Sequence, residues 1–222
     1  MIAEQDKEDP LFSLLIFDLD GTLIDSRQDI ALSVNLTLND LGRPTLPEET
    51  IYGYVGNGVT RLIHDAVGSE DPALLKKADQ IFACHYLAHL SDKTRLYPGM
   101  ETVLNHYQDK KKVVATNKRA QFTRKIIENL GLSNQFELLI SADEVGPCKP
   151  DPAMIDYALK RLNQSTQETL VIGDMENDIL AARAAGVSVC AVGYGFGEAS
   201  RLRNAKPDFF AEKVSDLATF PF

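Results

Sequence analysis

The sequence predicts an α/β fold, in which a parallel β-sheet carries helices on both faces and a small helical domain is inserted. Short apolar runs alternate with helical patterns through the second half of the chain, as they do in parallel sheets. The first apolar run is followed by a long stretch that has helical periodicity and no clear strand. A length of 222 residues suits one such domain with an insertion.

The first predicted strand covers residues 14–17, all of them apolar. Such a run is typical of a parallel strand that is buried on both faces. Asp18 and Asp20 follow at its carboxyl end, where ligands of open α/β sheets bind. Because strand side chains alternate, the two carboxylates share a face, and like charges this close need a cation or a shared proton. The pair indicates metal-assisted chemistry, although a strand followed by an Asp-Gly turn fits the same residues.

The long stretch after this strand is predicted to be an inserted cap. A crossover between parallel strands needs only about a dozen residues, and this one is far longer. We therefore expect a helical cap domain over residues 26–95 and an α/β core made of residues 1–25 and 96–222. The hinges are expected near residues 24–26 and 96–99.

The start of the predicted cap has a clear helical signature. Apolar residues recur at helical spacing at Ile30, Val34, Leu38 and Leu41. Ser26 and Asp29 resemble an N-terminal capping pair for this helix. The first helix of the cap is therefore expected to begin directly after Ser26.

The second half of the chain alternates regularly. Further strands are predicted at residues 113–115, 138–140, 170–172 and 187–192, and helices at residues 121–130, 152–162 and 176–185. Gly193, Gly195 and Gly197 follow the last strand without the spacing of a dinucleotide-binding loop. We expect a flexible loop at these glycines.

Composition excludes several classes of protein. Hydrophobic residues make up 44% and charged residues 25%, as in ordinary globular proteins. The 32 acidic and 23 basic residues give a formal charge of -9, which argues against nucleic acid or an anionic membrane as the main partner. Three cysteines without a Cys-x-x-Cys pair indicate reduced thiols.

The N-terminal stretch does not resemble a targeting signal. Residues 1–10 are acidic and lack the apolar segment of a signal peptide, and we expect the first nine to form a frayed tail. Nowhere do about 18 apolar residues run together. The sequence therefore predicts a soluble, cytoplasmic protein.

Polar residues follow the later strands as well. Thr116 and Asn117 can bind phosphate oxygens, or cap a helix. Lys149 lies next to Pro150 and can neutralise a phosphoryl group, although a lone loop lysine is usually a surface charge. A last set of basic residues is expected to help attract anions: Lys110, Lys111, Lys112, Lys118, Arg119 and Arg124.

Two more carboxylates follow the strand at residues 170–172. Asp174 lies at its end and Asp178 lies one helical turn further, so both can face one ion, or Asp174 can simply cap a helix. All these clusters are expected at the edge that bears Asp18 and Asp20. Four carboxylates with a lysine and a hydroxyl suit octahedral Mg²⁺ better than zinc or copper.

These clusters resemble, in order, the four motifs of the haloacid dehalogenase superfamily. The matching residues are Asp18 to Thr22, Thr116 with Asn117, Lys149 with Pro150, and Gly173 with Asp174 and Asp178. The resemblance covers nearly the whole chain and implies a Rossmann-like core with a helical cap. Met175, where many relatives carry a small hydroxyl residue, and Pro147 with Cys148 depart from the usual pattern.

The resemblance implies a Mg²⁺-dependent phosphatase that works through an aspartyl-phosphate. Asp18 would attack phosphorus, and Asp20 would protonate the leaving alkoxide and then deprotonate water. Mg²⁺ would be held by Asp18, the backbone carbonyl of Asp20, Asp174 and, directly or through water, Asp178. Thr116, Asn117 and Lys149 would grip the phosphoryl oxygens.

The cap is expected to touch the rest of the substrate. Residues 55–59, Val-Gly-Asn-Gly-Val, are similar to those of phosphoglycolate phosphatases, which makes 2-phosphoglycolate the preferred substrate. The predicted contacts are Gly56, Asn57, Gly58 and Arg61, with Arg61 pairing with a substrate carboxylate. A glycine-capped junction between two cap helices explains the same residues.

Other functions stay open on the sequence. A sugar phosphomutase has the same core, and a pyrophosphatase or nucleotidase differs only in the preference of the cap. A phosphorylatable signalling or interaction module also pairs an aspartate with Mg²⁺, but it needs neither a cap nor Asp20. The sequence leaves the oligomeric state undetermined.

Overall fold

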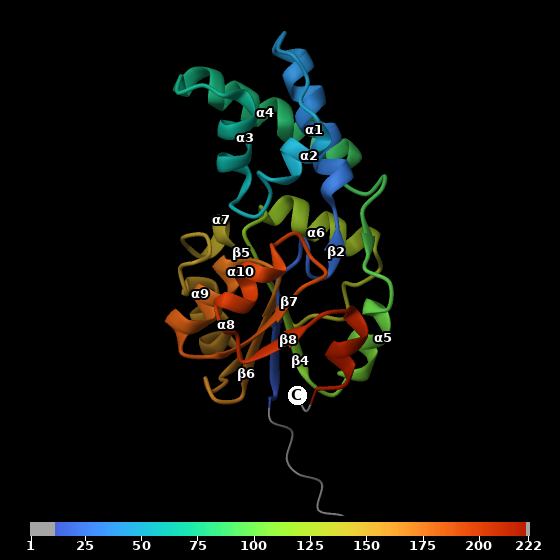
Figure 1. The fold of residues 1–222 in the computed structure, drawn as a ribbon, viewed down its shortest axis with the longest axis vertical. Coiled ribbons are helices and arrows are strands. Elements are labelled where there is room, and N and C mark those ends of the chain that lie inside the picture. The colour runs from blue at the N-terminus through green and yellow to red at the C-terminus, as the bar shows by residue number, and fades with distance from the viewer. Residues whose placement is uncertain (1–11, 221–222) are drawn as a thin grey trace, which may run out of the picture.

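A computed structural model describes residues 12–220, so the predicted tail lies outside the described residues. The molecule is elongated, with a helical part above an α/β part (Figure 1). The α/β part contains a parallel sheet in the order β5-β4-β1-β6-β7-β8. Its strands are β1 (Leu14–Phe17), β4 (Lys111–Thr116), β5 (Leu138–Ser141), β6 (Thr169–Gly173), β7 (Ser188–Val192) and β8 (Phe209–Ala211).

Helices cover both faces of this sheet, as predicted. Along β1, Leu15 and Phe17 belong to one apolar cluster, and Leu14 and Ile16 belong to another on the opposite face. This alternation follows from the period of two of a β-strand. All four side chains are at most 1% exposed, which explains the unbroken apolar run.

Each apolar cluster takes side chains from its own set of helices. The first includes residues of α5 (Met100–His106), α6 (Ala120–Asn129) and the 3₁₀ helix Val214–Ala218. The second includes residues of α7 (Ala142–Val145), α8 (Ala153–Leu162), α9 (Glu176–Ala185) and α10 (Ala199–Asn204). The predicted helices at 121–130, 152–162 and 176–185 correspond to α6, α8 and α9. The edge strand β8 was not predicted.

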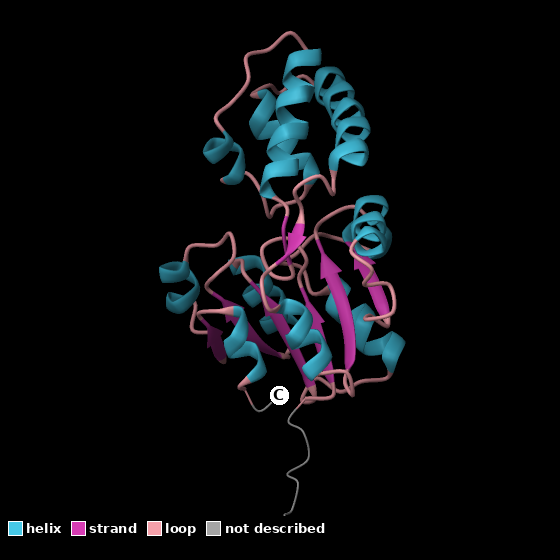
Figure 2. Cartoon of the chain, turned by 90° about the vertical axis from the view of Figure 1, so that its right-hand side faces the viewer, coloured by secondary structure: helices cyan, strands magenta, loops and turns pink. Residues whose placement is uncertain are grey.

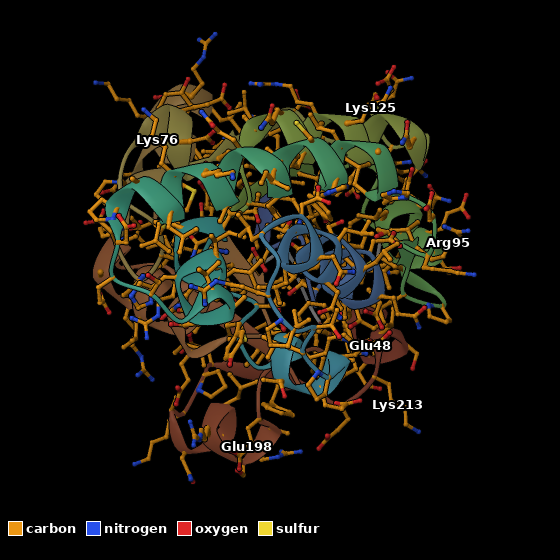
Figure 3. All side chains as sticks on the ribbon, turned by 90° about the horizontal axis from the view of Figure 1, so that it is seen from above. Glu48, Lys76, Arg95, Lys125, Glu198 and Lys213 are labelled. Carbon is orange, nitrogen blue, oxygen red and sulfur yellow. The ribbon has the colours of Figure 1, made fainter. Side chains whose placement is uncertain are left out.

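The predicted cap residues form a group of helices at one end of the molecule. These are α1 (Arg27–Asp40), α2 (Glu48–Tyr52), α3 (Val59–Val67) and α4 (Pro72–His89). They stand above the carboxyl ends of the sheet strands (Figure 2). Figure 3 shows the helical end of the molecule from above and labels Glu48 of α2 and Lys76 of α4, which are both exposed. We call residues 27–89 the helical segment.

A short antiparallel ribbon joins the helical segment to the sheet. It pairs β2 (Ile24–Asp25) with β3 (Arg95–Leu96), at the two places where hinges are predicted. Aromatic rings also pack across the junction: Tyr86 of α4 meets Phe122 of α6 edge to face at 5.0 Å. Such pairs add stability beyond the burial of their area.

The predicted capping pair of α1 is wrong. Ser26 is the N-cap residue, but its side chain caps nothing and donates instead to Asp20. The Asp29 carboxylate accepts from the backbone N–H groups of Lys93 and Thr94 and from the Thr94 hydroxyl. This buried carboxylate thus has its hydrogen-bond partners, and it joins the first helix of the helical segment to the residues that follow its last helix.

Within residues 12–220, no helix combines the length and the apolar character that crossing a membrane requires. The longest helix, α4, has 18 residues and buries Ala78, Phe82 and Tyr86 against its neighbours. These three side chains therefore serve packing within the protein.

Candidate active site

The order of the strands brings the predicted motifs together. β1 lies at the centre of the sheet, with β4 on one side and β6 on the other. Asp18 after β1, Thr116 at the end of β4 and Asp174 after β6 therefore lie at one edge. From β1 the sheet extends through β4 and β5 on one side and through β6, β7 and β8 on the other. This edge is therefore a topological switch point, where ligands of open α/β sheets bind.

Three carboxylates converge at this edge. Asp18, Asp174 and Asp178 each offer an oxygen, and these atoms all lie within 4.8 Å of one another. Asp18 is 8% exposed and the other two are at most 1% exposed. Like charges so close in a buried place are unfavourable unless cations neutralise them.

Hydrogen bonds hold two of these carboxylates in fixed orientations. Asp174 accepts from the Thr22 hydroxyl at 2.9 Å and from the backbone N–H of Phe196 at 2.7 Å. Asp178 accepts from the backbone N–H of Met175 at 3.0 Å, at the start of α9. The carboxylates are thereby preorganised for a ligand.

Glycines allow the backbone to approach the carboxylates closely. A Cβ atom on Gly21, which has a φ of +87°, would lie 2.1 Å from an oxygen of Asp174. Cβ atoms on Gly195 and Gly197 would also collide with Asp174, at 2.3 and 2.0 Å. The loop predicted at residues 193–197 is thus packed directly against the site, which is why glycine is needed there.

Lys149 links the carboxylates to the sheet. Its ammonium donates to Asp18 at 2.7 Å, to Asp178 at 2.6 Å and to the backbone carbonyl of Ala115 at 2.8 Å. These bonds use its three donors. The ammonium is 5% exposed, so the loop lysine of the sequence is a buried group of the site.

The electrostatics of the site favour a bound cation. Burial raises the pKa of Asp18 from the ordinary 3.8 to about 7; Lys149 opposes this rise and Asp178 adds to it. Burial and the charges of Asp18 and Asp178 raise the pKa of Asp174 well above its ordinary value. Burial lowers the pKa of Lys149, but the same two neighbours reverse the shift and leave it raised.

The donor set fits a hard divalent cation. When all three carboxylates are ionised, they face a single ammonium and leave an excess of two negative charges. All three donors are oxygen atoms, the kind that Mg²⁺ prefers, and within residues 12–220 no cysteine or histidine belongs to this group.

Metal removal is expected to make the protein sensitive to alkaline pH. In EDTA, folded Asp18 keeps its proton up to about pH 7, whereas the unfolded chain releases it near 3.8. The folded state then binds more protons between these values, so the free energy of unfolding falls as the pH rises through this range. Asp174 acts in the same direction.

Thermal melting in EDTA should therefore give a lower Tm at about pH 8 than at about pH 5, and Mg²⁺ should raise the Tm more at the higher pH. NaCl at matched ionic strength serves as the control. An equal effect of Mg²⁺ at both pH values would contradict the prediction.

Asp20 lies beside this cluster and has different partners. Its carboxylate accepts from the Ser26 hydroxyl at 2.5 Å and lies 3.0 Å from the ammonium of Lys118. Lys118 also donates to the phenolic oxygen of Tyr86 at 2.8 Å. Asp20 thus faces the hinge and the lysine that follows β4, while its neighbour Asp18 faces Lys149.

The Asn117 side chain bridges the two parts of the protein. Its amide donates to the backbone carbonyls of Gly56 and Lys149, at 3.1 and 3.2 Å, and its oxygen accepts from the Lys149 backbone N–H at 2.7 Å. Both amide protons are therefore in use. Thr116 is buried beside it and accepts from the backbone N–H of Lys118.

A cavity lies between the site and the helical segment. Its polar wall includes Asp18, Asp20, Thr116, Asn117, Lys118, Arg119, Lys149, Asn177 and Asp178. Its apolar wall includes Ile30, Val55, Val59, Leu62, Phe82, Tyr86, Phe122 and Met175. Gly56 and Gly58 complete the lining. The cavity is therefore charged at the sheet and apolar beneath the helices.

Two predicted cap contacts lie elsewhere. The Asn57 oxygen accepts from the Asn177 amide at 2.8 Å, which ties the loop before α3 to α9. Arg61 pairs with Asp65 at 2.8 Å, and its side chain is 62% exposed. Because α3 buries Leu62 and Ile63 and not Arg61, the structure does not bring Arg61 into the cavity.

Sequence reasoning missed part of this cavity. Lys118, grouped with general anion-attracting residues, is a buried partner of Asp20. Phe82 and Tyr86 were not singled out from the sequence, because helical periodicity does not reveal which surface a residue faces. Their spacing of four residues was the one available signal that both lie on the same side of a helix.

Known proteins match nearly the whole chain. Residues 15–192 match the model of the haloacid dehalogenase-like hydrolases. A phosphoglycolate phosphatase of Colwellia psychrerythraea is 38% identical over 213 residues, covering 92% of this chain and 94% of that protein. One of Chromobacterium violaceum is 37% identical over 193 residues, covering 84% and 87%.

A solved structure is similar in fold. It is a crystal structure described as a predicted phosphoglycolate phosphatase from Haemophilus somnus 129pt, and it superposes with a TM-score of 0.89 at 29% identity. The match covers 94% of this chain and 97% of that one. With the relatives, it identifies the chain as an enzyme, a phosphoric monoester hydrolase. The chain belongs to the haloacid dehalogenase-like hydrolase family.

Proposed function

We propose that this chain is a cytoplasmic, Mg²⁺-dependent phosphatase that hydrolyses a small phosphorylated metabolite, with 2-phosphoglycolate as the preferred substrate. The observation that carries the proposal is the convergence of Asp18, Asp174 and Asp178 on one point next to Lys149. Relatives named phosphoglycolate phosphatases support the choice of substrate.

Asp18 is the nucleophile in this proposal. A carboxylate oxygen of Asp18 bonds to phosphorus while the bond between phosphorus and the ester oxygen breaks, which gives an aspartyl-phosphate. The bond from Lys149 at 2.7 Å fixes the orientation of the carboxylate. Thr116 and backbone N–H groups after β4 bind the phosphoryl oxygens, and the charge of Lys149, beside Asp18, helps to neutralise them.

Asp20 is the acid and then the base. It donates a proton to the ester oxygen as the alcohol leaves, and it later takes a proton from the water that attacks the aspartyl-phosphate. That second attack releases inorganic phosphate and restores Asp18. The hydroxyl of Ser26 and the ammonium of Lys118 orient the Asp20 carboxylate toward this task.

Asp18, Asp174 and Asp178 would hold Mg²⁺, with the Asp20 backbone carbonyl as a further ligand. The cation neutralises negative charge on the phosphoryl oxygens when it is bound. The carboxylates themselves contribute fixed geometry, because Thr22, Phe196 and Met175 restrain them.

The helical segment acts as a cap domain, within the boundaries 26–95 that the sequence predicts. Gly56 and Gly58 line the cavity and bring backbone close to the substrate. The bond from Asn117 to the Gly56 carbonyl and the bond between Asn177 and Asn57 hold this loop over the site. A closed cap excludes water while Asp18 attacks.

The alternatives predict different products. A sugar phosphomutase returns the phosphoryl group to a sugar, and a pyrophosphatase or nucleotidase prefers other leaving groups. The relatives named as phosphoglycolate phosphatases favour hydrolysis of a small ester. A signalling module would keep its phosphoryl group and would not turn over.

Phosphate release with purified protein tests the proposal. We expect Mg²⁺-dependent turnover of 2-phosphoglycolate and of p-nitrophenyl phosphate, with the higher kcat/KM for 2-phosphoglycolate, and loss of turnover in EDTA. Sugar phosphates, pyrophosphate and nucleotides complete the panel. Absence of phosphate release from every substrate in the presence of Mg²⁺ would refute the phosphatase mechanism.

A further inference from the structure

We infer that Lys118 and Tyr86 form a subsite for a carboxylate on the leaving group of the substrate, attached to the carbon atom that carries the phosphate ester. The inference rests on the proposed function and names the feature that selects its substrate. Lys118 follows β4 in the core, and Tyr86 belongs to α4 in the helical segment. The two residues meet inside the cavity.

The ammonium of Lys118 is a buried cation. Its side chain is 6% exposed, and it contacts Asp20 at 3.0 Å and the Tyr86 oxygen at 2.8 Å. It also lies 4.6 Å from the centre of the Tyr86 ring. Burial lowers the pKa of Lys118, but Asp20 and Tyr86 reverse the shift, so the group remains charged at neutral pH.

Tyr86 has a proton to offer. Its oxygen accepts the bond from Lys118, so the phenolic proton is free for donation. Among residues 12–220, the structure shows no hydrogen bond that this phenol donates. Burial raises the pKa of Tyr86 to about 12, which keeps the proton on the oxygen. An ammonium and a phenol side by side provide the two donors that a carboxylate needs.

Lys118 makes two polar contacts and so keeps one of its three donors, whereas the other cations of the cavity are committed elsewhere. Lys149 donates to Asp18, Asp178 and a backbone carbonyl. Arg119 pairs with Asp79 of α4 at 2.6 Å. The remaining wall beneath the helical segment is apolar, through residues such as Phe82 and Phe122. An anionic group of the substrate would therefore find its donors at Lys118 and Tyr86.

The proximity of Lys118 to Asp20 fixes where the carboxylate must be. As the acid, Asp20 hydrogen-bonds the ester oxygen of the substrate at about 2.7 Å. Lys118 lies 3.0 Å from the same carboxyl group, so it reaches groups directly next to that oxygen. In 2-phosphoglycolate the carboxylate is attached to the carbon that bears this oxygen. A longer leaving group would carry its charge past Lys118 into the apolar wall.

Two substrates of similar size test the subsite. In 2-hydroxyethyl phosphate a hydroxymethyl group replaces the carboxylate of 2-phosphoglycolate, and the measured quantity is the ratio of their kcat/KM values. This ratio does not depend on the fraction of folded protein. Lys118→Met should lower the ratio on the order of 30-fold and Tyr86→Phe about fivefold, while Lys118→Arg should keep most of it.

The outcomes separate the hypotheses. Equal losses for both substrates in Lys118→Met would mean that Lys118 only positions Asp20, which overturns the subsite. A wild-type ratio near one would also overturn it, while hydrolysis of both esters would leave the phosphatase intact. If neither ester nor p-nitrophenyl phosphate is hydrolysed, the proposed function fails, and the subsite with it. Arg124→Met, which breaks an exposed ion pair with Glu144, is the control and should leave the ratio unchanged.

Discussion

Asp18→Asn is expected to lower kcat by at least about 10⁴-fold, because an amide cannot displace the ester oxygen from phosphorus. The substitution keeps the size of the side chain and the bond that its oxygen accepts from Lys149. It also removes one of three converging buried carboxylates. The metal-free variant should therefore melt at a higher temperature than the metal-free wild type at about pH 8.

Phosphate release at saturating substrate and thermal melting in EDTA measure the two effects. Asp156→Asn is the matched control, since Asp156 is exposed on α8 and does not line the cavity. It should change neither quantity. Substantial turnover by Asp18→Asn would show that another group attacks phosphorus, and a lowered Tm would show that Asp18 stabilises the metal-free fold.

The sheet and its polar edge could be predicted because their signals are local. Four apolar residues before Asp18 define a strand buried on both faces, and the structure has β1 at the same positions. Parallel strands deliver their carboxyl ends to one edge, so Asp18, Thr116 and Asp174 had to be neighbours if their strands were adjacent. Strand order itself is a long-range property that these local signals do not give, and it is known here from the structure.

Side-chain partners were harder to predict than positions. Ser26 and Asp29 have the spacing of a capping pair, yet Ser26 donates to Asp20 and Asp29 binds Thr94 across the hinge. The first contact spans six residues and the second spans 65, and neither is the local capping bond that the spacing indicates. Asn117 is similar: it lies at the site, but its amide is occupied by the backbone carbonyls of Gly56 and Lys149.

The predicted contacts of the cap show most clearly what cannot be predicted from the sequence. Helical periodicity identifies the buried face of α3, so it could have excluded Arg61 from the interior, but it does not say which face looks onto the active site. The glycines at 195 and 197 were equally ambiguous. Their spacing suggests only a loop, and their close approach to Asp174 depends on how that loop folds back.

Gly21→Ala is expected to disrupt the metal site with one added methyl group. The Cβ atom would lie between 2.1 and 2.8 Å from three atoms of the Asp174 carboxylate, at a backbone φ of +87° that L-residues rarely adopt. Asp174 would have to leave its bonds with Thr22 and Phe196. We expect the Mg²⁺ concentration that gives half-maximal kcat to rise at least about 100-fold. This corresponds to about 3 kcal/mol of binding free energy lost through misplacement of the Asp174 ligand.

Gly42→Ala is the control that separates backbone strain at a positive φ from steric collision of the added Cβ atom. Gly42 has a φ of +67°, so alanine meets a similar backbone penalty, but nothing lies within 4 Å of its added Cβ. This variant should lose about 1 kcal/mol of stability and keep the wild-type activation by Mg²⁺. Titration of kcat with Mg²⁺ distinguishes the two variants. If both respond to Mg²⁺ as the wild type does, the close approach of Gly21 to Asp174 has no part in holding the cation, and the carboxylate must tolerate displacement.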